Sequence, residues 1–107
     1  MAENQELINN VEKELERKPD PAELRVASKT KVNKLAGSII AKFNEFGYAK
    51  LRCIGDGAIG VGFRGATIAI NRMSLADVSA CITGAFFVVE LENGEQRNGS
   101  IINVEPR

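Results

Sequence analysis

Residues 54–65 read IGDGAIGVGFRG, and their glycines at positions 55, 57 and 60 match the dinucleotide-binding pattern G-x-G-x-x-G. The stretch follows a strand-like run, AKLRCI (residues 49–54), and leads into a helix-like run, GATIAINRM (residues 65–73). A strand, a glycine-rich turn and a helix in this order form the context of a nucleotide site. The pattern therefore predicts either a bound nucleotide or a helix whose glycines allow close packing.

The surroundings of these glycines favour packing. In a Rossmann fold the glycines follow the first strand, and an acidic residue ends the next strand to hold the ribose. Here the glycines follow the second predicted strand. The acidic residue that lies about 20 positions after them, as a ribose-binding residue would, is Asp77, and it would begin the next strand. Asp56 would place a carboxylate inside the turn that should hold a pyrophosphate. We therefore expect no cofactor.

Projected as a helix, residues 58–73 have two apolar surfaces. One is a wide arc made of Ala58, Ile59, Gly62, Phe63, Ala66, Ala69, Ile70 and Met73. The other consists of Val61 and Ile68 beside Gly65, and the sequence leaves open whether a second copy of the chain covers it. We expect Gly55 and Gly57 to shape the turn. Because glycine costs about 1 kcal/mol in a helix, we expect Gly60, Gly62 and Gly65 to allow close packing.

Around this stretch the chain alternates strand and helix signals. Residues 3–18 have the spacing of a short helix, with Leu7, Ile8, Val11 and Leu15 on one side and two prolines after it. We treat residues 1–21 as an N-terminal helical arm and residues 22–107 as the domain. The domain's predicted elements are a strand at 23–28, a helix from a Thr30 N-cap to Phe46 with Gly47 as its stop, a strand at 48–54, the glycine-rich helix ending near Arg72, and strands at 77–92 and 95–105.

The last two strands meet at Asn93-Gly94, the strongest short hairpin signal. A two-residue turn there would place Glu90 opposite Arg97. The resulting βαβαββ order predicts an α/β (α+β) two-layer sandwich, with two helices on one face of a four-stranded mixed sheet.

Composition excludes several classes of function. The 107 residues are enough for one domain, with 44% hydrophobic and 26% charged residues, as in ordinary globular proteins. No apolar run has the length of a membrane span, and the acidic start is not a signal peptide, so we expect a cytoplasmic protein without a membrane partner. Cys53 and Cys81 are expected to be buried, reduced thiols. Without histidine they form neither a zinc site nor a Cys-His nucleophile pair, so we expect no metal and no enzyme activity.

The formal net charge of zero conceals an uneven distribution. Residues 1–22 contain three basic and six acidic residues (−3), residues 23–72 nine basic and three acidic (+6), and residues 73–107 two basic and five acidic (−3). A basic middle of this kind indicates an anion-binding surface.

From about Leu24 onwards the chain resembles the stage V sporulation protein S family. The matching pieces are LRVASKTKVNKLAGSI, IGDGAIGVGFRGATIAI, VSACITGAFFVVELENGEQR and the terminal INVEPR. That family is in turn similar to the Alba proteins, small chromatin- and RNA-binding dimers of βαβαββ order. The resemblance implies a non-enzymatic, oligomeric regulator of sporulation or a related developmental programme.

The resemblance to Alba implies a nucleic-acid surface, but only part of it matches. The basic loop before the first helix corresponds to SKTKVNK, so Lys29, Lys31 and Lys34 are expected to contact phosphates. Additional basic residues near the glycine-rich stretch and in the hairpin are Arg52, Arg64, Arg72 and Arg97. The turn at Asp56 and the hairpin with Glu90, Glu92 and Glu95 are acidic instead of basic, and a phosphate backbone would repel them.

Two hypotheses of function remain from the sequence. The first is a nucleic-acid-binding regulator, for DNA or RNA, that uses these basic residues. The second is a protein-interaction oligomer whose contacts include Val61, Gly65, Ile68, Phe86 and Phe87. Strand alternation places one of the two phenylalanines outward, whereas a bulge at Gly84 would place both in the core, which is the simpler interpretation. For the acidic arm we expect either a position over the lysine loop, competing with anions, or a role in oligomerisation.

Overall fold

The computed structural model describes residues 20–107, so the helix predicted in the arm lies outside the described residues. The described elements are β1 (Glu23–Val26), α2 (Val32–Phe46), β2 (Ala49–Ile54), α3 (Asp56–Leu75), β3 (Ala80–Glu90) and β4 (Gln96–Pro106). The predicted βαβαββ order is confirmed.

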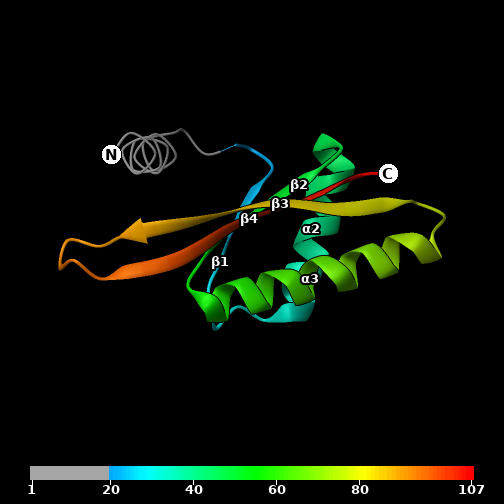
Figure 1. Cartoon of the computed structure of the whole chain (residues 1–107). Helices are drawn as coiled ribbons and strands as arrows, with labels where there is room; N and C mark the ends of the chain where they lie inside the picture. Colours follow the sequence, from blue (N-terminus) through cyan, green and yellow to red (C-terminus); the bar gives the residue numbers. More distant parts are fainter. Residues whose placement is uncertain (1–19) are drawn as a thin grey trace.

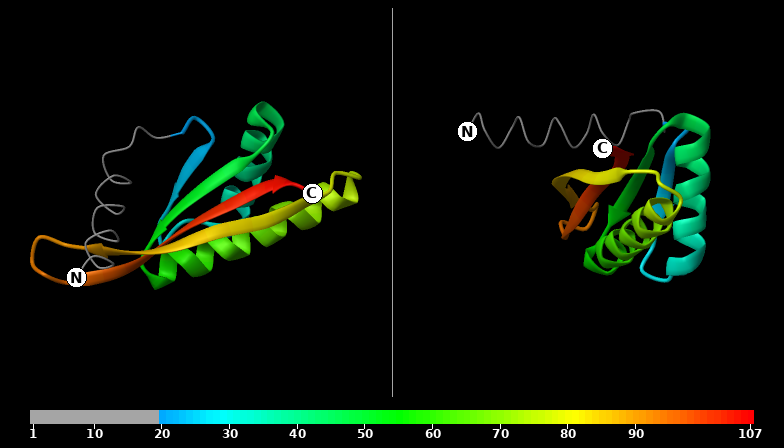
Figure 2. Two further views of the ribbon diagram at one scale, coloured as in Figure 1. Left: turned by 45° about the horizontal axis from the view of Figure 1, so that its top comes forward. Right: turned by 90° about the vertical axis from the view of Figure 1, so that its right-hand side faces the viewer.

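The four strands form one mixed sheet in the order β1-β2-β4-β3. β1 runs parallel to β2, whereas β4 is antiparallel to both of its neighbours. Both helices cover the same face of this sheet, as Figure 1 and the right-hand view of Figure 2 show. We call the other side the open face. The predicted two-layer sandwich is therefore confirmed, with β1 and β3 at the edges of the sheet.

Close packing joins α3 to the sheet. Ala49, Leu51 and Cys53 of β2 are fully buried and point towards the helices. Opposite them lies the small-residue side of α3. A Cβ atom built on Gly62 would lie 2.6 Å from the Cys53 Sγ and 3.3 Å from the Ile102 Cδ1. Only a residue without a side chain fits at that distance, so the packing role predicted for Gly62 is confirmed.

A second close contact joins the two helices. A Cβ atom on Gly65 would lie 2.6 Å from the Leu35 Cδ2 and 2.9 Å from its Cγ. Val61 and Ile68, on the same side of α3, are half-buried and pack against the core. Gly60 is exposed, and an added Cβ would meet nothing within 4 Å. The packing role predicted for Gly60 is therefore wrong.

The glycine-rich turn is shorter than predicted. Gly55 has a φ of 95°, which an L side chain rarely adopts, and α3 begins directly after it at Asp56. Gly57 thus lies in the first helical turn, where a Cβ atom would come within 3.0 Å of the Ser28 Cβ. Gly57 does not shape the turn; it allows the β1–α2 loop to approach α3. Asp77, with a φ of 61°, lies in the turn before β3.

The two ends of α2 differ in how well the sequence predicted them. The predicted cap, Thr30, does not cap the helix, because its Oγ1 accepts a hydrogen bond of 2.9 Å from the backbone N–H of Ala27. Lys31 occupies the N-cap position without a side-chain hydrogen bond. At the other end Gly47 is left-handed, with a φ of 84°, and donates to the Phe43 carbonyl, so the predicted stop is confirmed.

The β3–β4 hairpin has a longer loop than predicted. The Leu91 carbonyl accepts a hydrogen bond from the Gly94 N–H, and the Leu91 N–H donates to the Glu95 carbonyl. These bonds close a three-residue loop with Gly94 left-handed, which is a common alternative to the two-residue turn. The longer loop shifts the register by one residue. Glu90 therefore lies opposite Gln96, and the predicted pairing of Glu90 with Arg97 is wrong.

The two adjacent phenylalanines of β3 point to opposite faces. Pairing with β4 runs without interruption from Ala80 to Glu90, so there is no bulge at Gly84. Phe86 lies on the helix side and is 65% exposed. Phe87 lies on the open face, where its ring would clash with a side chain at Gly99. The expectation that a bulge puts both rings in the core is wrong, and strand alternation holds.

Both cysteines are free thiols, but their surroundings differ. Cys53 is fully buried, and this burial raises the pKa of its thiol from 9.0 to about 11. Cys81 is only half-buried, on the open face, so the expectation that both thiols are buried is wrong for Cys81. We predict that iodoacetamide at pH 8 modifies Cys81 in the folded protein and Cys53 only after denaturation, as mass spectrometry would show. Equal labelling of both thiols in the folded protein would contradict this packing.

Candidate nucleic-acid interface

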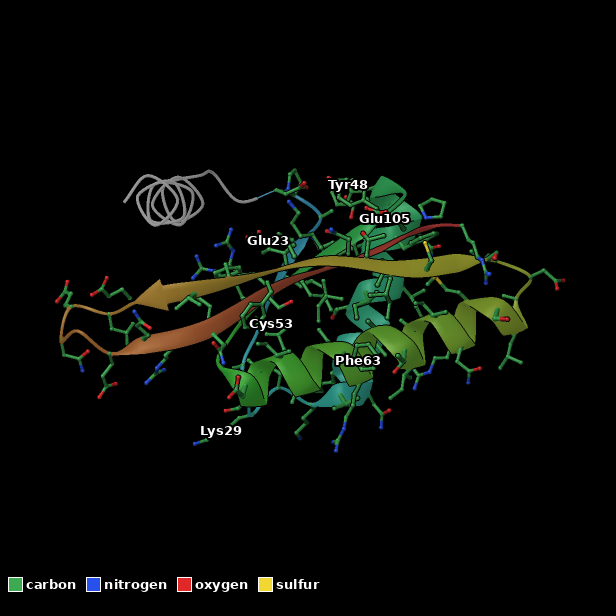
Figure 3. The ribbon with its side chains drawn as sticks, viewed as in Figure 1. Glu23, Lys29, Tyr48, Cys53, Phe63 and Glu105 are labelled. Atoms are coloured by element: carbon green, nitrogen blue, oxygen red, sulfur yellow. The ribbon has the colours of Figure 1, made fainter. Side chains whose placement is uncertain are left out.

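The three predicted lysines lie together at one end of the molecule. Lys29 belongs to the loop between β1 and α2, near the start of α3 (Figure 3), while Lys31 and Lys34 belong to the start of α2. All three are exposed, and within residues 20–107 none of them makes an ion pair. The first turn of α2 holds no acidic residue and no side-chain cap. Its free N–H groups and the helix dipole therefore favour an anion at this position.

Packing brings one of the predicted arginines to the edge of this lysine group. The lysine loop contacts α3 at Gly57, and the first turn of α2 contacts it at Gly65. Arg64 is exposed and directly precedes Gly65. It follows Gly57 by seven residues, which is about two helical turns, so it lies on the same side of α3 as Gly57. We name the group Lys29, Lys31, Lys34 and Arg64 the lysine surface.

The other predicted arginines lie elsewhere. Arg72 is exposed in the last turn of α3, about 12 Å along the axis from Arg64 at 1.5 Å per residue, where a cation suits the helix dipole. Arg52 lies on the open face, and its Nε is 3.4 Å from the Oε1 of Glu23. Arg97 lies on the open face of β4, opposite Val89. The structure thus divides the predicted phosphate contacts among three surfaces.

The predicted acidic turn and acidic hairpin are joined to each other at the start of α3. Asp56 accepts a hydrogen bond of 3.0 Å from the Asn98 side chain, and the Gly55 N–H donates to the Asn98 carbonyl at 2.6 Å. These bonds attach the base of the hairpin to the start of α3, a link that no sequence pattern had indicated. The exposed Glu90, Glu92 and Glu95 lie near the tip of the hairpin, which extends past α3 (Figure 1).

The residues predicted as oligomer contacts do not form one surface. Gly65 is buried beneath Leu35 of its own chain, so it presents no surface to a second copy. Phe86 and Phe87 lie on opposite faces of the sheet. Phe63 belongs to the wide apolar arc of α3, yet it is 54% exposed. Its position at the margin of the apolar arc of α3 is the signal that could have identified it.

The described part of the chain contains neither a metal-binding cluster nor a membrane-spanning helix. Within residues 20–107, no three histidine, cysteine, aspartate or glutamate side chains are grouped so that they could hold a metal ion. None of the helices in this range is long and apolar enough to cross a membrane.

The comparison with protein families agrees with the fold and with the sequence motifs. The family model described as "Stage V sporulation protein S (SpoVS)" matches residues 22–107, which is most of the chain. The matched range begins just before β1 and ends at the C-terminal residue, so it includes both helices and all four strands. The chain therefore belongs to the SpoVS family, and the family relates it to sporulation.

Proposed function

We propose that this protein is a cytoplasmic, non-enzymatic regulator that binds nucleic acid through the lysine surface. The observation that carries the proposal is the position of Lys31 and Lys34 at an uncapped helix start that holds no acid. Lysine side chains and free helix N–H groups converge there, and both bind phosphate oxygens.

The proposed contact is with the backbone and not with base edges. Lysine is a flexible point charge, and the lysine surface offers no described aromatic ring on which a base could stack. The acidic hairpin tip would repel a phosphate chain, so we expect the bound chain to follow the lysine surface and to avoid the hairpin tip. We therefore expect weak sequence preference, with DNA and RNA both bound.

The proposal is tested by mapping a nucleic-acid titration on the folded protein by NMR. With a short mixed-sequence RNA at low salt, we expect the amide signals of residues 29–35 and of Arg64 to shift. Signals of residues 90–96 in the hairpin should stay in place. Shifts confined to the hairpin, or no shifts at all, would contradict the proposed surface.

We propose a second property, self-association along the β3 edge, on a separate observation. β3 is an edge strand of 11 residues that carries no charge before Glu90. Phe86 on the helix side of this strand is 65% exposed, and Phe63 of α3, the helix that packs on β3 and β4, is 54% exposed. An uncharged strand edge next to exposed aromatic rings is a surface that natural proteins usually cover. A second copy, related by a two-fold axis, would cover it with the same surface.

Charge placed in this surface should prevent the association. We expect light scattering to give an oligomer for the unchanged chain and a monomer for Phe86→Glu, because a carboxylate at the interface loses its water. Leu75→Glu is the control, since Leu75 is 82% exposed at the far end of α3 and should be replaceable without effect. A monomeric unchanged chain would contradict the proposed self-association.

A further inference from the structure

The open face of the sheet carries an aromatic ring beside small and apolar side chains. Phe87 of β3 is half-buried and lies over Gly99 of β4, its partner in register. A Cβ atom on Gly99 would lie 2.5 Å from the Cζ of this ring, so a glycine is needed for the ring to lie so close to the sheet. The next pair on the same face, Ala85 and Ile101, adds two side chains without polar atoms. The sheet therefore holds the ring in place beside a surface against which a planar group can lie.

Basic side chains border this surface on the side of β1 and β2. By register Arg25 of β1 lies beside Arg52 of β2, and Arg52 lies beside Ile101. Lys50 precedes Arg52 by two residues and shares its face. Arg25 is exposed and Lys50 is half-buried, and within residues 20–107 neither forms an ion pair. The Oε1 of Glu23 lies 3.4 Å from the Arg52 Nε, which offsets the acidic charge on this side.

This border continues into the lysine surface. Arg25 lies one residue before the end of β1, and the loop that follows carries Lys29. The four residues from Arg25 to Lys29 span at most about 14 Å. Phe87 lies at the same end of the sheet, because its partner Gly99 is also paired with Ile54, the last residue of β2. A chain held at Lys29 can therefore pass round the end of β1 onto the open face.

A single-stranded nucleic acid has the chemistry that this face would bind. Its phosphates suit the basic border, and its unpaired bases offer planar faces that stack on aromatic rings. A duplex keeps its bases stacked on one another, so Phe87 would not reach their faces. Within residues 20–107 the other acidic residue of this face is Glu105, six residues along β4 from Gly99 and about 20 Å away. At physiological salt it would hardly affect a phosphate near Phe87.

From these observations we propose that a single-stranded nucleic acid held at the lysine surface continues onto the open face. One of its bases stacks there on Phe87, and its backbone contacts Arg25 and Lys50. This contact rests on the proposed function and adds bases to the phosphates that the lysine surface holds. The lysine surface binds any phosphate chain, whereas the open face needs bases that are unpaired.

Two probes with the same backbone separate stacking from phosphate contacts. We would compare oligo(dT) of about 12 nucleotides with an abasic oligodeoxynucleotide of the same length, by competition anisotropy with the full-length protein at low salt. The bases should tighten binding on the order of tenfold, as stacking on one ring does. Equal, salt-dependent affinity for both probes would overturn the base contact and leave the lysine surface in place. No binding of either probe would contradict both.

Phe87→Leu should remove most of the preference for oligo(dT), because leucine keeps the apolar contact but has no ring. Phe86→Leu is the matched control, since Phe86 lies on the opposite face of the same strand and should leave the preference unchanged. The pair Lys31→Glu with Lys34→Glu should weaken both probes by the same factor. An unchanged preference in Phe87→Leu would overturn the proposal.

A second pair of substitutions keeps the ring and its contact with Gly99. Ala85→Glu places a carboxylate on the open face beside Phe87, at a position that is exposed. It should weaken the binding of oligo(dT) more than about fivefold, because the charge repels the backbone. Asn71→Glu adds the same charge at an exposed position of α3, on the helix side, and should have little effect. Equal losses for the two variants would overturn the position of the bound strand.

Discussion

Gly65→Ala is expected to lower the free energy of unfolding by about 1–2 kcal/mol, because its methyl group has no room between α3 and α2. The added carbon would lie 2.6 Å from one carbon of the Leu35 side chain and 2.9 Å from another. Overpacking of a core costs about 1–3 kcal/mol, and two carbons closer than 3.0 Å place Gly65→Ala in the upper part of that range, about 2–3 kcal/mol. The better helix propensity of alanine offsets about 1 kcal/mol of that cost. Thermal unfolding followed by circular dichroism should show a Tm lower by roughly 5–15 °C.

Gly60→Ala is the matched control in the same helix. Position 60 is exposed, and the added methyl group would meet nothing within 4 Å. Only the helix propensity changes there, so we expect a gain of about 0.5–1 kcal/mol. If both substitutions stabilise the protein, α2 and α3 do not pack at Gly65 as described.

The double substitution Lys31→Glu with Lys34→Glu is expected to weaken nucleic-acid binding about a hundredfold near 0.1 M salt. Each lysine that contacts a phosphate releases a bound counterion, which is worth roughly tenfold in affinity under these conditions. Both side chains are exposed at the start of α2, so the fold should be unaffected. Fluorescence anisotropy with labelled RNA measures the loss, and circular dichroism checks the fold.

Lys42→Glu supplies the control for charge alone. Lys42 lies near the other end of α2, with its Nζ 5.4 Å from the centre of the Phe46 ring. If affinity depends on the lysine surface, this substitution should weaken binding only slightly through the change in net charge. An equal loss per charge at Lys42 and at Lys31 would mean that binding follows overall charge and involves no defined site.

The architecture was predictable because several independent signals agreed on it. Three signals depend on local geometry that tertiary contacts did not change. They are the small-residue side of α3, the left-handed Gly47 after α2 and the alternation in β2. The start of α2 was not predictable, because Thr30 can either cap a helix or bond within its own loop. The hairpin register was missed for a similar reason, since Asn93-Gly94 is compatible with more than one loop length.

The candidate site was only partly predictable, since it depends on which elements meet. The lysine loop is local in sequence, so its three charges could be grouped without a structure. The position of Arg64 beside them follows from the contacts at Gly57 and Gly65, which join residues about 30 positions apart. Strand alternation turns Arg52 away from the buried Leu51 and Cys53, and its pairing with Glu23 follows from the parallel pairing of β1 with β2, which the sequence pattern alone did not specify.

The central claim is that the lysine surface binds phosphate backbones, and the salt dependence of binding tests it most directly. We would measure the anisotropy of labelled mixed-sequence RNA and of duplex DNA with the full-length protein at about 50 and 200 mM salt. With three or four phosphate contacts, the affinity for duplex DNA should fall roughly 40- to 150-fold over this range, and that for RNA less. Binding that does not change with salt, or no binding at the lower concentration, would contradict the account.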